Sequence, residues 1–89
     1  MDEIEDWRMI DGALRAKYLT GDFRSGLRFV NAIGEAADRA NHHPDVTLTY
    51  PAVELTLISH DVDQVTDRDR KLASRINEIA RAQGIHSES

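Results

Sequence analysis

The sequence predicts an α+β domain of order β-β-α-β-β-α, in which two helices cover one face of a four-stranded antiparallel sheet. Three observations lead to this prediction. Short segments near the start and in the middle of the chain alternate apolar and polar residues, as half-buried strands do. Two longer segments place apolar residues three and four positions apart, which is the period of an amphipathic helix. Glycine or proline stands at several of the breaks.

The first hairpin is predicted over residues 7–18. Residues 7–10 and 14–18 alternate in character and flank Asp11-Gly12, a dipeptide that is typical of tight turns. Two short antiparallel strands are therefore expected here.

The first helix is predicted to follow directly. Asp22 is a candidate N-cap, and from there the apolar period becomes helical. Its apolar positions are Phe23, Leu27, Val30, Ile33, Ala37 and Ala40. Asn41 can adopt the left-handed conformation that closes a helix, and Pro44 disfavours helical geometry in the residue before it. The helix is therefore expected to end near residues 40–42.

A second hairpin and a second helix complete the pattern. Residues 46–50 and 53–57 alternate around a proline break, which predicts two more strands. Thr66 and Asp69 have the spacing of a capping box, so a helix is expected over residues 67–83. The apolar positions in and just before this helix are Val65, Leu72, Ala73, Ile76, Ile79 and Ala80.

Length and composition limit the rest of the interpretation. The chain has 89 residues, no cysteine and a formal net charge of −5. A single domain of this size has a thin core, and without cysteine neither disulfides nor thiolate zinc reinforce it. Self-association is the expected source of further stability. We expect residues 1–4 to be disordered, residues 5–83 to form the domain and residues 84–89 to be a polar tail.

Charge and hydropathy disfavour several classes of function. The 16 acidic residues outnumber the 11 basic ones, which are dispersed, so no direct binding of nucleic acid is predicted. No apolar run approaches the roughly 20 residues of a transmembrane helix, so no membrane association is expected. The acidic N-terminus lacks the basic and apolar regions of a secretion signal, which indicates a cytoplasmic protein.

Three of the four histidines flank the second hairpin. His42 and His43 follow the first helix, and His60 ends the returning strand, so antiparallel pairing brings the two loci together. Each also has a purely structural explanation, because imidazolium is favourable at a helix C-terminus and a histidine at a strand end is commonly a surface residue. For His86, in the polar tail, only the structural explanation applies.

The arrangement of these histidines favours acid/base chemistry over other kinds of site. Zinc is disfavoured because the side chains of adjacent His42 and His43 diverge. A nucleophilic triad from Ser59, His60 and Asp61 is disfavoured because sequence neighbours rarely reach triad geometry. Free imidazole titrates at about pH 6.5, so near neutral pH one histidine can donate a proton while another accepts one. That combination suits the elimination or addition of water.

Two carboxylates near the histidines have structural explanations of their own. Asp38 lies one helical turn before His42 and is either solvated or paired with it at i,i+4 spacing. Asp69 fits the acceptor position of the capping box. Neither needs a functional role to account for its position in the sequence.

An acidic residue, His-His-Pro, an aromatic residue, a histidine and an aspartate follow one another here at defined spacings. They are Asp38, His42, His43, Pro44, Tyr50, His60 and Asp69. This pattern resembles that of the pterin-4a-carbinolamine dehydratases, and the similarity covers about residues 5–81. The motif is specific because all of its positions must agree together.

The resemblance implies dehydration of a 4a-hydroxytetrahydropterin to the quinonoid dihydropterin, a step that recycles the cofactor of aromatic amino-acid hydroxylases. It implies neither a metal nor a cofactor. His42 and His60 would form the acid/base pair, with the division of roles open, and His43 would bind and orient the pterin. Asp38 would tune His42. The further pterin-binding positions implied are Asp38, Asn41, Ile58, Ser59 and Asp61.

One departure from the family concerns assembly. Only six residues precede Trp7, so the family's usual N-terminal helix is expected to be missing, which affects oligomer geometry more than chemistry. We expect a homodimer or a homotetramer. Some relatives act as dimerisation cofactors of a transcription factor or as chaperones of carboxylase assembly, so a non-enzymatic binding role is an alternative. Handling of another pterin, such as a molybdenum-cofactor precursor, is a further one.

Overall fold

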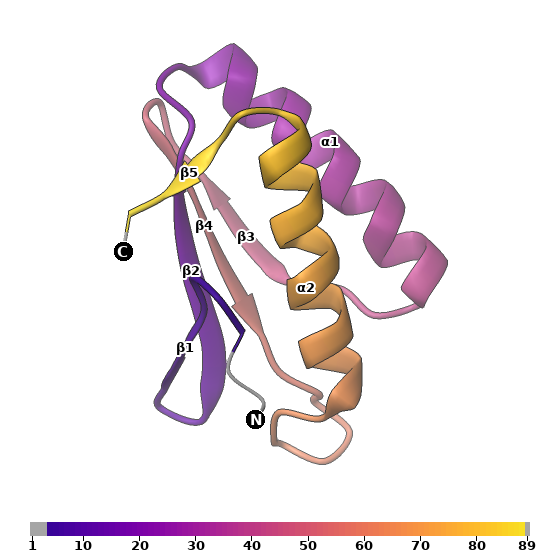
Figure 1. The fold of residues 1–89 in the computed structure, drawn as a ribbon. Helices are drawn as coiled ribbons and strands as arrows, with labels where there is room; N and C mark the ends of the chain where they lie inside the picture. The colour runs from indigo at the N-terminus through magenta and orange to yellow at the C-terminus, as the bar shows by residue number, and fades with distance from the viewer. Residues whose placement is uncertain (1–3, 89) are drawn as a thin grey trace.

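The computed structural model describes residues 4–88 and confirms the predicted α+β architecture (Figure 1). In chain order the elements are β1 (Arg8–Ile10), β2 (Ala13–Leu19), α1 (Phe23–Ala40), β3 (Asp45–Leu48), β4 (Ala52–Leu57), α2 (Asp67–Ala82) and β5 (His86–Ser87). The main strands lie in the order β1-β2-β4-β3, and each neighbouring pair is antiparallel. Both helices lie on the same side of the sheet (Figure 1). Within residues 4–88, no helix precedes β1.

A fifth short strand adds to the four that the sequence predicts. β5 pairs with the second half of β2, where Tyr18 lies opposite Ser87 and Leu19 opposite His86. The segment predicted as a polar tail, residues 84–89, therefore contains a strand, and two polar residues give no periodic signal that could predict it. The disorder predicted for residues 1–4 falls outside the described residues except at Ile4, which is half-buried and packs against the core.

The core forms between the sheet and the two helices. Across β2 and β4, Leu14 faces Leu57, Ala16 faces Leu55 and Tyr18 faces Val53. All six side chains are buried. The helices add the buried residues Phe29, Ile33, Ala36, Ala37, Leu72, Ala73, Ile76, Ile79 and Ala80. This shared core places α1 and α2 in contact with each other, and the candidate site lies where they meet.

The first helix has the predicted ends but a different buried face. The carboxylate of Asp22 accepts a hydrogen bond from the backbone N–H of Ser25 at 2.7 Å, and Asn41 closes the helix in the left-handed conformation at φ 53°. Phe23 and Leu27, predicted among the apolar positions, are about half exposed, at 48% and 46%. The buried face instead contains Gly26, where an added Cβ would lie only 2.7 Å from Leu48 Cδ1. This close approach to the sheet leaves the two larger side chains outside the core.

A buried hydrogen-bond network joins the first hairpin to α2. Trp7 Nε1 donates to Tyr18 Oη at 3.0 Å and to Asn77 Oδ1 at 3.2 Å. The Tyr18 hydroxyl also donates to Asn77 Oδ1, and Asn77 Nδ2 donates to the backbone oxygen of Glu5 at 2.7 Å. Burial raises the pKa of Tyr18, so its hydroxyl keeps its proton and remains a donor.

Replacing Asn77 with leucine should destabilise the fold. Asn77→Leu keeps the volume but removes the acceptor that the buried Tyr18 hydroxyl uses, and an unsatisfied buried donor costs about 1–3 kcal/mol. We expect the free energy of unfolding, measured by denaturant titration, to fall by about that amount. Ser74→Ala, at an exposed position of the same helix, is the control and should change it by less than about 0.5 kcal/mol. Equal stability of the two variants would contradict the role assigned to Asn77.

Candidate active site

The site forms where α1 ends and α2 begins. After the left-handed residue Asn41, the chain turns so that the side chain of His42 lies against Asp69 in the first turn of α2. His42 Nε2 is 2.5 Å from Asp69 Oδ1. The His42 side chain is 10% exposed and that of Asp69 is fully buried. The predicted helix end and the predicted capping box are both confirmed, and together they bring these two residues into contact.

The buried carboxylate of Asp69 accepts two further hydrogen bonds. Ser59 Oγ donates to Oδ2 at 2.8 Å, and the backbone N–H of Thr66 donates to the same oxygen at 2.9 Å, completing the capping box. Burial raises the pKa of Asp69, but the hydrogen bonds from His42, Thr66 and Ser59 outweigh burial and hold it below its usual value. Asp69 is therefore ionised at neutral pH.

The ionised carboxylate determines which nitrogen of His42 carries the hydrogen. A carboxylate only accepts hydrogen bonds, so Nε2 of His42 is the donor, and in the neutral ring Nδ1 keeps its lone pair. Within residues 4–88, no hydrogen bond to Nδ1 is formed. His42 can therefore accept a proton at Nδ1 and donate it again, with the ring held in place by Asp69.

Asp38 does not pair with His42, which was one of the two arrangements considered for it. Asp38 Oδ1 instead contacts His43 Nε2 at 2.9 Å, and both of these side chains are largely exposed. The i,i+4 rule applies only while the backbone stays helical, and the left-handed conformation of Asn41 turns His42 away from the face that carries Asp38. The direct carboxylate partner of His42 is Asp69.

The loop after β4 holds the second group of predicted residues. Its backbone is closed by a bridge between Ser59 and Gln64. Asp61 Oδ1 accepts a hydrogen bond from Arg68 at 2.7 Å, which lowers the pKa of Asp61. Ile58 is half-buried, whereas His60 is exposed and its ring makes no hydrogen bond or ion pair within the described chain. Ser59 and Asp61 thus contact other site residues, and His60 follows Ser59 directly.

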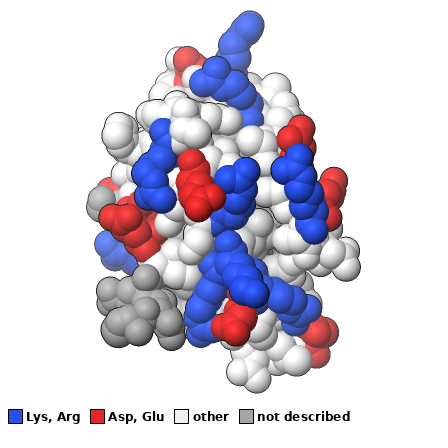
Figure 2. Space-filling view, turned by 45° about the vertical axis from the view of Figure 1, so that its right-hand side comes forward, with Lys and Arg blue, Asp and Glu red and all other residues white. Residues whose placement is uncertain are grey.

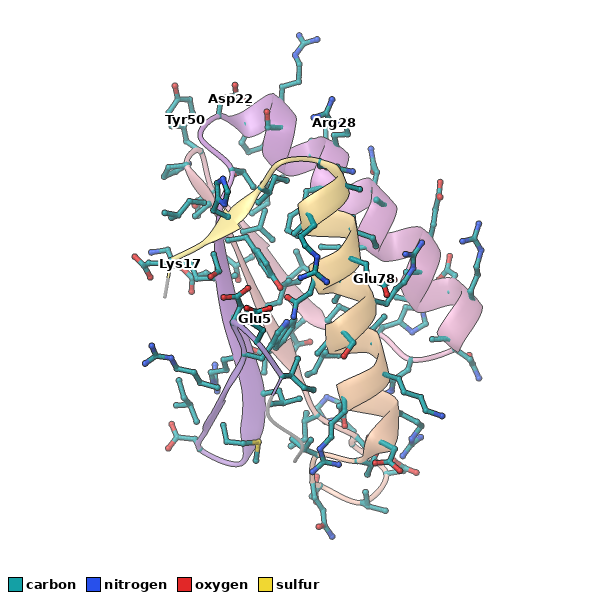
Figure 3. All side chains as sticks on the ribbon, in the orientation of Figure 1. Glu5, Lys17, Asp22, Arg28, Tyr50 and Glu78 are labelled. Carbon is teal, nitrogen blue, oxygen red and sulfur yellow. The ribbon has the colours of Figure 1, made fainter. Side chains whose placement is uncertain are left out.

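Tyr50, the aromatic residue of the motif, lies away from these groups. It is 68% exposed and stands in the turn between β3 and β4, which hydrogen-bonds to Thr20 and Gly21. Figure 3 shows it beside Asp22, at the N-terminal end of α1, whereas His42 follows the C-terminal end.

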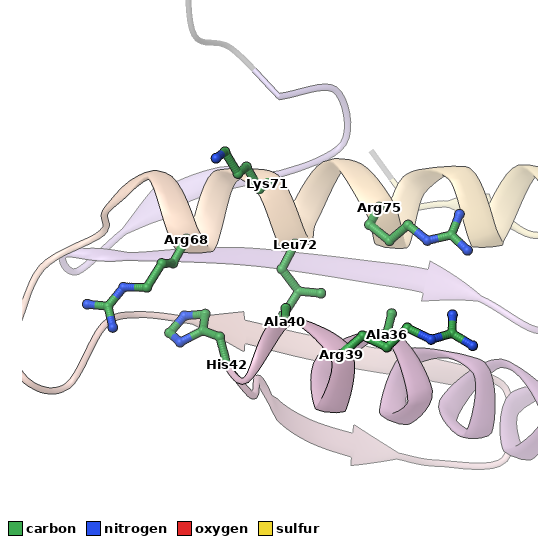
Figure 4. A pocket seen from close by; sticks show the side chains of 8 residues that line it. All are labelled: Ala36, Arg39, Ala40, His42, Arg68, Lys71, Leu72 and Arg75. Atoms are coloured by element: carbon green, nitrogen blue, oxygen red, sulfur yellow. The ribbon is translucent and has the colours of Figure 1, made fainter.

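A pocket of about 410 Å³ lies beside His42, between the last turns of α1 and the first turns of α2 (Figure 4). Its lining consists of Ala36, Arg39, Ala40, His42, Arg68, Lys71, Leu72 and Arg75. Among these, only His42 was predicted as a site residue. The spacing of Arg68, Lys71 and Arg75 does place them on one helical face, but the sequence does not indicate that this face borders α1. The side chains of His43 and His60 do not line this pocket.

Residues 4–88 contain neither a candidate metal site nor a candidate membrane-spanning helix. Across residues 4–88, no three or more His, Cys, Asp or Glu side chains are grouped so that they could hold a metal ion. Neither α1 nor α2 has the length and apolar character that crossing a membrane requires.

Comparisons with known proteins show the family to which this chain belongs. The family model described as pterin 4 alpha carbinolamine dehydratase matches residues 1–79. The chain belongs to this family. A relative from Koribacter versatilis, provisionally named a pterin-4-alpha-carbinolamine dehydratase, is 42% identical over 79 residues, which cover 89% of this chain and 84% of the relative. A relative of the same provisional name from Thermomicrobium roseum is 39% identical over 80 residues, covering 90% and 86%.

Solved structures share the fold of this dehydratase-family protein. A crystal structure described as a transcriptional coactivator/pterin dehydratase from Brucella melitensis matches with a TM-score of 0.82 and 29% identity, covering 86% of this chain and 84% of that one. A pterin dehydratase-like protein described as a RuBisCO assembly factor of the alpha-carboxysome matches with a TM-score of 0.73 and 19% identity, covering 85% and 90%. The second similarity shows the fold alone.

The lowered pKa of Asp69 predicts a pH dependence of stability. Because the folded state holds this carboxyl below its usual value of 3.8, its contribution to stability is present above that value and is lost as the pH falls through the folded pKa. We expect the free energy of unfolding to fall on acidification below about pH 4, and to fall less in Asp69→Asn, where this group no longer titrates. Denaturant titrations across the acidic range measure both slopes.

Asp67→Asn is the matched control, because Asp67 is an exposed carboxylate in the same helical turn. This variant should keep the acid sensitivity of the unaltered protein. An Asp69→Asn variant with the same acid sensitivity as Asp67→Asn would contradict the assignment.

Proposed function

We propose that this protein dehydrates 4a-hydroxytetrahydropterins to quinonoid dihydropterins by histidine acid/base catalysis. The observation that carries the proposal is the buried, ionised Asp69, which orients His42 through Nε2. Nδ1 of His42 has no hydrogen bond within the described chain, and His42 is part of the pocket lining. Membership of the dehydratase family supports the same reaction. We further propose that the protein acts in the cytoplasm and that its reaction recycles a pterin cofactor for an aromatic amino-acid hydroxylase.

The reaction requires two proton transfers and no redox step. The bond between C4a and the hydroxyl oxygen breaks while an acid protonates that oxygen, which leaves as water. A base removes the proton from N5, and the electrons of the N–H bond form the C4a–N5 double bond. One proton is given and one is taken, so the total number of protons on the enzyme is unchanged. The acid must regain a proton from solvent, and the base must lose one to it, before the next turnover. Each positioned acid or base typically contributes about 10² to 10⁴ in rate.

His42 and His60 are the two groups proposed for these transfers. Asp69 stabilises the protonated form of His42 that arises when Nδ1 accepts a proton, because the positive imidazolium and the negative carboxylate are then in contact, with Nε2 and Oδ1 2.5 Å apart. His60 follows Ser59, whose hydroxyl donates to Asp69, so its backbone is adjacent to a residue that contacts Asp69, although its side chain is not part of the pocket lining. The pH–rate profiles of the histidine variants distinguish which of the two acts as the acid.

The remaining proposed contacts bind and orient the pterin. His43, with its ring against the Asp38 carboxylate, presents an exposed imidazole next to His42. Asp61, held ionised by Arg68, is suited to accept hydrogen bonds from pterin N–H groups. Asn41, Ile58 and Ser59 complete the proposed set.

The exposed apolar side chains support self-association as a homodimer or homotetramer. Phe23 and Leu27 of α1 and Val46 of β3 are exposed, and within the described chain β3 is an edge strand paired only with β4. An unpaired strand edge beside apolar side chains is a surface suited to a second copy.

His42→Ala should lower kcat for dehydration by about 10² to 10⁴, because it removes one of the two proton-transfer groups. The assay follows the absorbance of enzymatically generated 4a-hydroxytetrahydropterin, with the spontaneous rate subtracted. His86→Ala is the matched control, since His86 lies in β5 outside the pocket lining. No acceleration by the unaltered protein would reject the enzymatic function and favour the role of a binding or assembly protein.

His60→Ala should change the shape of the pH–rate profile as well as its height. With two titrating histidines, kcat/KM is expected to be bell-shaped, and removal of His60 should abolish one limb because only one of the two protonation requirements remains. Steady-state rates across the neutral range measure this. A bell-shaped profile unchanged by His60→Ala would remove His60 from the acid/base pair.

A further inference from the structure

The pocket beside His42 carries a positive charge that acid/base chemistry does not require. Four of its eight lining residues are basic, namely Arg39, Arg68, Lys71 and Arg75. Among the residues that the structure describes, none of its lining residues is acidic. The chain as a whole has a net charge of −5, so the lining of the pocket is basic although the chain is acidic.

Nearby carboxylates neutralise only part of this charge. Arg68 pairs with Asp61 at 2.7 Å and Arg75 pairs with Glu78 at 3.0 Å. Within residues 4–88, neither Arg39 nor Lys71 forms an ion pair. Figure 2 shows basic side chains gathered on one face of the molecule, with fewer acidic ones between them. The pocket therefore keeps an excess of positive charge.

The basic residues extend along the pocket away from His42. Figure 4 shows His42 beneath Arg68 at one end, with Arg39 and Arg75 at the other end and Leu72 between them. Arg68 and Arg75 are two helical turns apart, which corresponds to about 10 Å along α2. A ligand bound at His42 by its ring system would thus reach Arg39 and Arg75 only with a substituent several atoms long.

We propose that the pterin handled at this site carries an anionic substituent, a phosphate or a carboxylate, which Arg39 and Arg75 bind. The inference rests on the proposed function and narrows its substrate class. Guanidinium groups bind such anions through paired, charge-assisted hydrogen bonds, and Arg75 keeps donors beyond the one that contacts Glu78. The pocket volume of about 410 Å³ is that of a small-molecule site, so the anion is part of a small ligand. Lys71 adds charge at the rim.

The test compares two dihydropterins that differ in one group. One carries a neutral trihydroxypropyl substituent at C6, and the other carries the same substituent with a terminal phosphate. Calorimetric titration of the intact protein should give a dissociation constant about 10-fold lower for the phosphorylated compound at low salt. The difference should shrink at high salt, because the attraction is between charges near the surface.

Arg39→Gln/Arg75→Gln should reduce the ratio of the two dissociation constants to near one. Arg24→Gln/Arg28→Gln is the matched control, because it removes the same charge from exposed positions of α1 outside the pocket and should keep the ratio. If the double variant does not fold, the single variants and the salt dependence of the unaltered protein report the same interaction.

Failure of this inference is distinguishable from failure of the proposed function. Equal affinities for the two compounds, or a preference that survives Arg39→Gln/Arg75→Gln, would overturn the anionic substituent while dehydration of the neutral substrate continued. Absence of both pterin binding and dehydration would instead reject the function itself. A preference lost equally in the Arg24→Gln/Arg28→Gln control would show a general charge effect and would also overturn the inference.

Discussion

The carboxylate of Asp69 is the interaction on which the site depends. It is fully buried, and its donors come from three parts of the chain, the turn after α1, the loop after β4 and the start of α2. A buried charge is costly unless hydrogen bonds compensate it, and here His42, Ser59 and the backbone of Thr66 supply them. The same three contacts determine how the two helices and the loop meet. Loss of the charge would weaken the capping box of α2 and the orientation of His42 together.

Asp69 both caps α2 and orients His42, so its structural and functional interpretations are compatible. A capping box requires only one carboxylate oxygen, which here is Oδ2. The second oxygen, Oδ1, is left to face His42. Because α2 packs beside the end of α1 in a shared core, the cap of one helix becomes the support of a histidine that follows the other.

The surface of the molecule separates into parts of different character. The groove between the helices is basic around His42, although the chain is acidic overall. The exposed apolar side chains of α1 and β3 lie outside the pocket lining. A small anionic ligand and a second copy of the chain would therefore bind to different surfaces. Binding at one surface would not block binding at the other.

The sequence by itself determined the elements that depend on neighbours a few residues apart. The alternation of β2 and β4, the N-cap Asp22, the left-handed Asn41 and the capping box of Thr66 and Asp69 are local features, and the structure contains each of them. The family motif also identified the position of His42 and Asp69 without showing that they touch. Only the tertiary structure decided contacts between distant segments: Asp69 rather than Asp38 against His42, Phe23 and Leu27 outside the core, β5 on β2, and the basic face of α2 along the pocket. The physical reason is that periodicity and capping act through adjacent turns of one element, whereas a side chain's partner across the core is set by how whole elements pack.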